Sequence, residues 1–478
     1  MARYAALRSV AASLALSHLF ALAAAGGGSE AAVCGASSRQ DCAGEETGLL
    51  QVARADGESG IPNKYTPYAR QLYTIPDWLP VMEPEHYDLM ERLGRNCSLS
   101  DPEREGCPFS GMNKDNIYNL FPGGKSACLC SSSPYYFQVK PGAADKLLLF
   151  FQGGGACWDQ LSFALGLCTK SATPGGWNGL LNFTRDDNPY RDYTMIKVLY
   201  CSGDMHAGNT ERPWGKHGET LQVRGYENTV AALEWALTNF PQLSELRFAG
   251  DSAGSLGVQW WARWVLAKFA GRETNALVIP DSFAGVLFPP SADEKSETYL
   301  FKAWNMCGDD ALTPEEQEQC RSGKLLLGNM FQQTIETNPS AQFAMINSKD
   351  DIVQRLFAKV FELSAEHSLK GALMTGEQYY KQLNLLVQMW SENANYRVYL
   401  VDGTRHTYTQ TEYVFVATPL SYCGKLGGHP LLIDWIPCGP PAPKRVVCLG
   451  KKVVVAPLLP PPRHAGTTYC DAKLMALQ

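Results

Sequence analysis

The sequence lacks the features that would indicate a nucleic acid or a metal as its main partner. No run of Lys and Arg is interleaved with aromatic residues, and the 478-residue chain has a formal net charge of −6, so we expect no nucleic-acid partner. No C-x-x-C pair accompanies a His cluster, and Cys128-Leu129-Cys130 has the wrong spacing for zinc. We therefore expect no metal and no cofactor.

Beyond residues 1–25 the chain has no apolar run long enough to cross a bilayer, so no stable membrane span is expected. Residues 1–25 carry Arg3 and Arg8, then an apolar segment, and end in Ala23-Ala24-Ala25 before a run of glycines. This layout is typical of a secretory signal peptide. An uncleaved anchor is the less favoured alternative, because polar residues interrupt a short segment. We predict a secreted, extracellular protein.

Cysteine usage agrees with an oxidising compartment. Fifteen cysteines behind a signal peptide indicate several disulfides, and the odd number leaves at least one unpaired or intermolecular. Two sequons, Asn96-Cys97-Ser98 and Asn182-Phe183-Thr184, are candidate glycosylation sites. They support the secretory prediction without deciding it.

Composition divides the rest of the chain into four segments. Residues 26–60 are rich in Gly, Ala, Ser and Glu and are predicted to be a flexible leader. Residues 61–126 are predicted to be an N-terminal extension laid over the main domain, with helical patches such as 85–93. Residues 127–438 form the main domain, and residues 439–478 a Pro-rich tail.

Apolar strands alternate with helices in the main domain. The pattern predicts helices at 225–240, 352–366 and 377–395, and strands at 135–139, 146–151, 193–201, 246–249, 276–281, 342–347 and 397–401. The first two strands, joined by a Pro-Gly turn, are predicted to form a pair. The alternation indicates a mostly parallel α/β sheet, in which catalytic residues gather at the carboxyl ends of the strands.

The pattern Gly250-Asp251-Ser252-Ala253-Gly254 stands between a strand and a Trp-rich helix. A G-x-S-x-G turn in that context holds a serine in a strained elbow with its hydroxyl exposed above the sheet. A simple tight turn is the alternative, because the chain contains 43 glycines. The flanking strand and helix favour a nucleophile.

Gly153-Gly154-Gly155-Ala156 follows another buried strand. Its amides are candidates for one half of an oxyanion hole, and the amide of Ala253 would supply the other. A phosphate-binding loop is the alternative, but the required Lys-Ser/Thr ending is absent.

A serine nucleophile needs a His base and a carboxylate. His406 follows the last apolar strand, with His429 in reserve, whereas His367 lies near a helix end. For the acid, Asp350 and Asp351 follow one strand and Asp281 another. Spacing alone leaves the acid open.

Assembled in this order, the motifs resemble those of the pectin acetylesterase and Notum family of secreted α/β-hydrolase-fold carboxylesterases. The similarity covers roughly residues 128–422, and also includes Asn188-Pro189, Tyr200-Cys201 and 347–354. The resemblance implies that Asp351 is the acid, that His406 is the base, and that Cys157 and Cys168 are bridged. Ala156 stands where the family usually has Trp, which would remove an aromatic wall from the pocket. The Pro-rich tail has no counterpart.

We therefore predict a serine carboxylesterase with an α/β-hydrolase-like, disulfide-stabilised catalytic domain at 127–438. Ser252 would attack the ester, His406 would act as base and then acid, and Asp351 would orient His406. The favoured substrate is an O-acetylated polysaccharide. The alternatives are removal of a fatty acyl group from a protein and a non-catalytic role in binding glycan or lipid. A general lipase is a further rival, although Gln152 stands where such enzymes have His.

Overall fold

The computed structural model describes residues 94–456 apart from short gaps at 101–105, 130–133, 160–161, 164–165, 215–218, 274, 287–294, 367–372, 416, 418–430, 439–444 and 450–451. The predicted signal peptide, the leader, the helical patch at 85–93 and His429 all lie outside the described residues. Of the predicted tail, only an antiparallel pair is described, β12 (Arg445–Leu449) with β13 (Lys452–Ala456).

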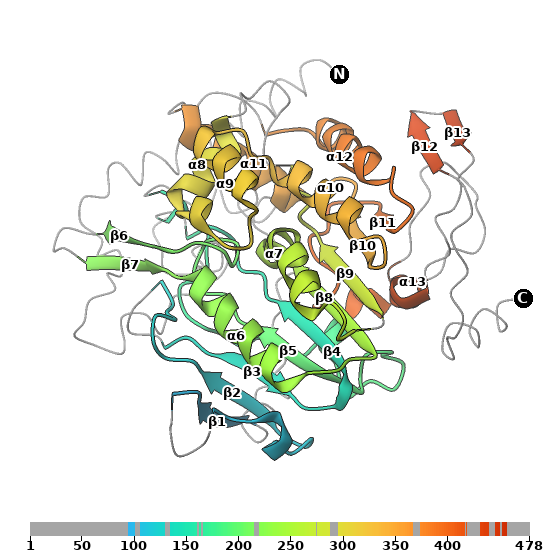
Figure 1. Cartoon of the computed structure of the whole chain (residues 1–478). Coiled ribbons are helices and arrows are strands. Elements are labelled where there is room, and N and C mark those ends of the chain that lie inside the picture. Colours follow the sequence, from blue (N-terminus) through green and yellow to red (C-terminus); the bar gives the residue numbers. More distant parts are fainter. Residues whose placement is uncertain are drawn as a thin grey trace, which may run out of the picture.

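A sheet of nine strands forms the centre of the molecule (Figure 1). Its order is β1-β2-β3-β5-β4-β8-β9-β10-β11, and β5 through β11 in this order run parallel. Only β3 is antiparallel to its neighbours. The bounds are β1 Gly94–Ser98, β2 Ile117–Phe121, β3 Phe137–Lys140, β4 Ala143–Phe151, β5 Tyr193–Val198, β8 Glu245–Asp251, β9 Ala276–Asp281, β10 Gln342–Ser348 and β11 Tyr396–Val401. A mostly parallel α/β sheet is thus confirmed.

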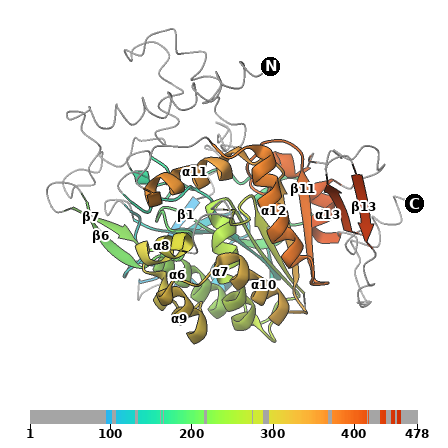
Figure 2. The same cartoon turned by 90° about the horizontal axis from the view of Figure 1, so that it is seen from above.

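Near-continuous apolar strands are explained by burial of both sheet faces. Successive residues of β4 point to opposite sides, so that Phe151 and Phe150 belong to two separate apolar cores. One face is covered by α6 (Gly225–Asn239), α7 (Ala253–Phe269) and α10 (Leu327–Thr337), which lie together with α9 (Pro314–Ser322) in Figure 2. On the other face, Trp177 and Leu180 from the segment before β5 pack against the strands, together with Trp435 of α13 (Leu432–Cys438).

Three further helices are α8 (Lys295–Ala303), α11 (Ile352–Glu366) and α12 (Gly376–Trp390). The ring of Trp390 in α12 packs against Phe331 of α10 and Tyr396 of β11. α8 and α11 meet through Tyr299 and Phe361, whose ring centroids are 6.2 Å apart. β6 (Thr210–Trp214) and β7 (Glu219–Val223) form a separate antiparallel pair of strands. No helix in the described ranges is long and apolar enough to cross a membrane.

The predicted pairing of the first two strands is wrong. β5 lies between β3 and β4 and pairs with both. The Pro141-Gly142 turn therefore spans the start of β5, and a Cβ on Gly142 would lie 2.3 Å from the carbonyl oxygen of Tyr193. Glycine at this position allows the turn to cross the neighbouring backbone closely.

Of the predicted extension at 61–126, only residues 94–100 and 106–126 are described, and these differ from the expectation. β1 and β2 do not lie over the sheet but extend it at one edge, where β2 pairs with β3. Disulfides in the described part of the chain link Cys97 to Cys107, Cys128 to Cys201, Cys157 to Cys168 and Cys307 to Cys320.

Candidate active site

Ser252 occupies the sharp turn between β8 and α7. Its backbone has φ 54° and ψ −121°, a left-handed conformation that a non-glycine residue adopts only under strain. A Cβ on Gly254 would lie 2.0 Å from the carbonyl oxygen of Phe151, so no larger residue fits where α7 passes β4. The turn thus carries the serine as the G-x-S-x-G pattern predicted.

The His406 side chain lies between Ser252 and Asp351. Its Nε2 is 2.8 Å from Ser252 Oγ, and its Nδ1 is 2.8 Å from Asp351 Oδ2. The His406 and Asp351 side chains are fully buried, so water does not compete for this pair. Three predicted residues from the ends of β8, β10 and β11 therefore converge in one hydrogen-bonded chain.

Surrounding donors hold Asp351 in place. Its Oδ1 accepts the amides of Val353 and Gln354 at 3.0 Å, and its Oδ2 accepts Gln354 Nε2 at 2.9 Å. Gln354 is fixed in turn by Asn347 Oδ1 at 2.8 Å. These donors fix the orientation of the carboxylate, so that its Oδ2 faces Nδ1 of His406.

The two other candidate acids have different neighbours. Asp350 pairs with Arg355 at 2.7 Å, away from the imidazole. Asp281, at the end of β9, accepts the amides of Tyr408 and Thr409 at 2.7 and 2.6 Å. Asp281 therefore anchors the loop that follows His406, a role that the sequence did not reveal.

The amides of the loop after β4 differ in whether they donate a hydrogen bond within the described residues. Gly153 donates to Asp251 Oδ1 at 2.9 Å, and Ala156 donates to the carbonyl oxygen of Leu167 at 2.9 Å. No hydrogen bond within the described ranges uses the amides of Gly154 or Gly155. The predicted participation of Ala156 in an oxyanion hole is thus not supported, because its amide donates to the carbonyl oxygen of Leu167 instead.

The disulfide between Cys157 and Cys168 closes this loop, as the family resemblance implied. Gly155 has φ 73°, and a Cβ there would lie 1.8 Å from the carbonyl oxygen of Leu167. Only glycine fits this turn. On the opposite side, Ala253 is the first residue of α7, where helix amides have no partner within the helix.

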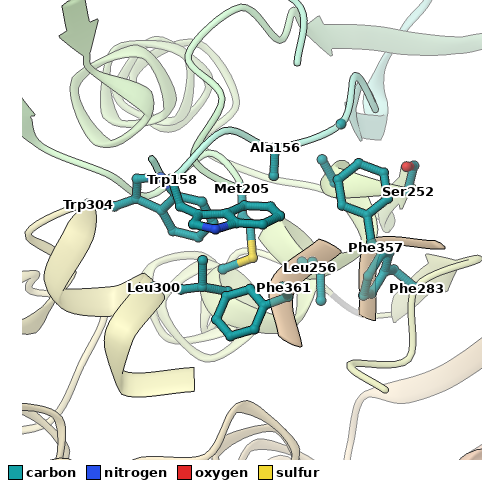
Figure 3. Close-up of a pocket in the computed structure, with 12 residues that line it drawn as sticks. Ala156, Trp158, Met205, Ser252, Leu256, Phe283, Leu300, Trp304, Phe357 and Phe361 are labelled. Carbon is teal, nitrogen blue, oxygen red and sulfur yellow. The ribbon is translucent and has the colours of Figure 1, made fainter. Parts of the chain in front are cut away.

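An apolar pocket, part of it open to solvent, begins at Ser252. In Figure 3, Ser252 lies at one side of the pocket, while Trp158 and Trp304 lie at the other. Apart from Ser252 the lining side chains are apolar, and most come from α7, α8, α11 and the loop after β4: Ala156, Trp158, Met205, Leu256, Phe283, Leu300, Trp304, Phe357 and Phe361.

The expected loss of an aromatic wall at Ala156 is wrong for this pocket. Trp158, two residues further along, is 2% exposed and lines it. Its ring lies 5.2 Å from that of Phe361 and 6.4 Å from that of Phe357. Trp158 could have been proposed from the sequence, because it directly follows Cys157.

The two sequons have different surroundings. Asn96 is exposed on the edge strand β1. Asn182 is 8% exposed, and its side-chain amide donates to Glu412 Oε1 at 3.0 Å. A glycan would have to replace that contact, so the structure does not favour Asn182 as a glycosylation site. Elsewhere in the described ranges, no group of three His, Cys, Asp or Glu side chains could hold a metal.

Comparison with known proteins gives a match to a family and matches to solved structures, among them two crystal forms of one protein. Residues 123–397 match the sequence model of a family described as Pectinacetylesterase. One of these structures is crystal form II of the Wnt deacylase Notum from Drosophila, which is 18% identical to this chain with a TM-score of 0.45. The match covers 62% of this chain and 87% of the Notum chain. Crystal form I has the same identity and TM-score, and covers 63% and 88%. No curated protein matches the chain.

Proposed function

Because the chain belongs to the pectinacetylesterase family, we propose that it is a serine carboxylic-ester hydrolase with Ser252 as its nucleophile. The observation that carries the proposal is the continuous set of hydrogen bonds from Ser252 through His406 to Asp351. A hydroxyl, an imidazole and a buried carboxylate in this order are the parts that acyl transfer requires.

The reaction follows from these contacts. Ser252 Oγ attacks the ester carbonyl carbon while His406 Nε2 accepts its proton, and Asp351 stabilises the resulting imidazolium through Nδ1–H. The oxygen of the tetrahedral intermediate takes the negative charge, and the amides of Gly154, Gly155 and Ala253 donate to it. The intermediate collapses as His406 protonates the leaving alcohol. Water, deprotonated by His406, then releases the acid from Ser252.

The pocket favours an ester with an apolar acyl chain of several carbons. From Ser252 to Trp304 the side chains that line the pocket are apolar and include the rings of Trp158, Phe357 and Phe361. Each methylene buried there contributes about 0.8 kcal/mol. This reading departs from the expectation of an O-acetylated polysaccharide and favours the fatty-acyl alternative. Deacetylation of a polysaccharide stays the second candidate, and the family description supports it.

The compartment and the domain bounds are further parts of the proposal. We place the protein in the secretory pathway, because a signal-like segment at 1–25 precedes a chain with disulfides at four described positions. The catalytic domain would span residues 127–438, after a leader at 26–60 and an extension at 61–126. An exposed Asn96 would carry a glycan.

Two measurements test the activity and the acyl class. The Ser252→Ala protein should retain its fold by circular dichroism but lose hydrolysis of p-nitrophenyl esters and labelling by a fluorophosphonate probe. Undiminished hydrolysis would reject the proposal, and a wild-type protein that neither reacts nor labels would indicate a non-catalytic binding role.

A series of p-nitrophenyl esters from acetate to dodecanoate separates the two substrate classes. We expect kcat/KM to be higher for chains longer than acetate, because added methylenes contact the apolar lining of the pocket. Activity confined to acetate would support deacetylation instead.

A further inference from the structure

Two buried side chains that take no part in the proposed reaction contact the oxyanion loop at 152–156. The carboxylate of Asp251 accepts the amide of Gly153 at 2.9 Å. His206 Nε2 lies 2.8 Å from the carbonyl oxygen of Gln152. The two contacts are made to consecutive residues, immediately before the unused amides of Gly154 and Gly155.

Asp251 lies directly before Ser252 in the elbow and is 6% exposed. Its Oδ1 would be only 3.4 Å from a Cβ on Gly153, so that carboxylate and loop are in close contact. Burial and the nearby Asp281 raise the pKa of Asp251 to about 7, while His406 and Lys197 on β5 act in the opposite direction. The same side chain therefore links the nucleophile turn to the loop opposite it.

His206 is held from several sides. Its ring stacks on Phe151 and lies against Tyr200, with centroid separations of 4.7 Å to each. Its carbonyl oxygen accepts Thr229 Oγ1 and Trp261 Nε1, both at 2.9 Å. Its backbone has φ 65°, a conformation that persists only where the surroundings enforce it.

The tautomer of His206 follows from its acceptor. A carbonyl oxygen can only accept, so Nε2 must carry the proton that bonds Gln152. Burial lowers the pKa of His206 to about 4, which keeps the ring neutral at physiological pH. The donor is therefore fixed in both place and protonation.

The other side of the loop is held differently. Ala156 donates to Leu167, and Thr169 donates back to Gly154 at 2.8 Å, beside the Cys157–Cys168 disulfide. Gly154 and Gly155 thus lie between the hydrogen bond to Asp251 in the elbow and the hydrogen bonds to Leu167 and Thr169. A displacement of about 1 Å in such a donor can cost about 10² in rate.

We propose that Asp251 and His206 are positioning residues that set the location of the Gly154 and Gly155 amides relative to Ser252. This inference rests on the proposed esterase function. The two side chains touch neither substrate nor nucleophile oxygen. They act through Gly153 and Gln152, and their effect should be confined to the state in which the carbonyl oxygen carries negative charge.

The test compares a transition-state analogue with a substrate. In Asp251→Ala and in His206→Phe, kcat/KM should fall about 10- to 100-fold with KM changed less than about threefold. The inhibition constant of an alkyl trifluoromethyl ketone should rise by the same factor as kcat/KM falls. Asp251→Asn keeps an oxygen that can accept the amide of Gly153, so it should stay within about threefold of wild type.

The outcomes are distinct. His206→Phe retains the stack on Phe151 and Tyr200, so it tests the inference even where Asp251→Ala does not fold. Unchanged inhibition and turnover in His206→Phe, or a loss of activity without weaker binding of the ketone, would overturn the positioning role. A wild-type protein that neither hydrolyses esters nor binds the ketone overturns the proposed function itself, and the positioning role with it.

Discussion

Asp350 and Asp351 are neighbours in the chain with opposite surroundings. Asp351 is fully buried and accepts four hydrogen bonds from Val353, Gln354 and His406. Asp350 forms an ion pair with Arg355 and is 38% exposed in its side chain. One position along the chain separates a group that orients an imidazole from one that pairs with the Arg355 side chain of α11.

This contrast predicts the effect of matched substitutions. Asp351→Asn should lower kcat about 10³- to 10⁴-fold, because an amide cannot hold His406 in the required tautomer or stabilise its charge. Asp350→Asn should change kcat less than about threefold. Steady-state kinetics on one p-nitrophenyl ester measure both, and equal losses in the two proteins would contradict the assignment of the acid.

At the residue scale the sequence could identify the participants but not every role. Ser252 and His406 stand out because each follows a strand whose end must lie at one edge of the sheet. Asp281 and Asp351 fulfil the same rule, and only the path of residues 402–411 decides between them. In that loop the amide of Tyr408 donates to Asp281, whereas the imidazole of His406 contacts Asp351. The loop has no periodic pattern, and residue spacing therefore does not predict these two contacts.

Ala156 illustrates the same limit. Its amide was predicted to bind an oxyanion, but it pairs with Leu167, eleven residues away, inside a disulfide-closed loop. The partner of a backbone amide in an irregular segment depends on the whole fold of that segment.

Among the elements, the loop closed by Cys157–Cys168 has a natural comparison in the Cys97–Cys107 loop beside β1. Their sequence separations are 11 and 10 residues, so each closes a similar ring. Only the first adjoins the oxyanion loop.

Removing each disulfide by a double Cys→Ser substitution should therefore separate stability from activity. Both proteins should lose about 3 kcal/mol of unfolding free energy, since the closed loops are of similar size. Only the Cys157→Ser/Cys168→Ser protein should lose kcat/KM as well, by about 10-fold or more. Denaturant unfolding and ester hydrolysis measure the two effects. A comparable loss of activity in both proteins would argue against a role of this disulfide at the site.

The strands themselves were largely predictable, and their order was not. β9 begins and ends where its apolar run does, and β10 extends the predicted strand by one residue. The order β3-β5-β4 depends on contacts between distant parts of the chain. β3 and β4 are consecutive in sequence, yet β5, which comes later, lies between them. A Pro-Gly turn between apolar runs indicates a change of direction, but it does not state which strand lies beside which.

For the molecule as a whole, buried carboxyl groups set a pH dependence of stability. Asp309 is 4% exposed, and burial together with Asp204 and Asp310 raises its pKa to about 9. The folded-state pKa exceeds the unfolded value of about 3.9, so the stabilising protonated form is fully present below that value. Its contribution is lost as the pH rises toward 9.

Asp309→Asn should remove this dependence. The variant should unfold at the same temperature as wild type near pH 4, and it should be more stable by about 1–3 kcal/mol at pH 8. Thermal unfolding across that range provides the measurement, with Asp192→Asn, an exposed position, as the control. A constant difference between Asp309→Asn and wild type at all pH values would refute the titration of this group.

Glycosylation offers a test of the secretory assignment. Asn96→Gln should abolish the mass shift that an N-glycosidase produces on protein secreted from eukaryotic cells, because Asn96 is exposed on an edge strand. Asn182→Gln should leave the shift intact, since that amide is buried against Glu412. Loss of the shift in the second protein alone would reverse the assignment.

The insertion of β5 between β3 and β4 also governs how the polypeptide acquires its shape during synthesis. β3 and β4 leave the ribosome together, yet neither has its shared neighbour until the chain has grown past residue 198. The Cys128–Cys201 crosslink, which spans 73 positions, likewise waits for that moment. Non-local pairing of this kind makes folding slow and leaves unpaired strand edges open to other chains. Pairing of β3 and β4 with β5 can therefore be completed only once residue 198 has been synthesised, and closure of the Cys128–Cys201 disulfide only once residue 201 has followed.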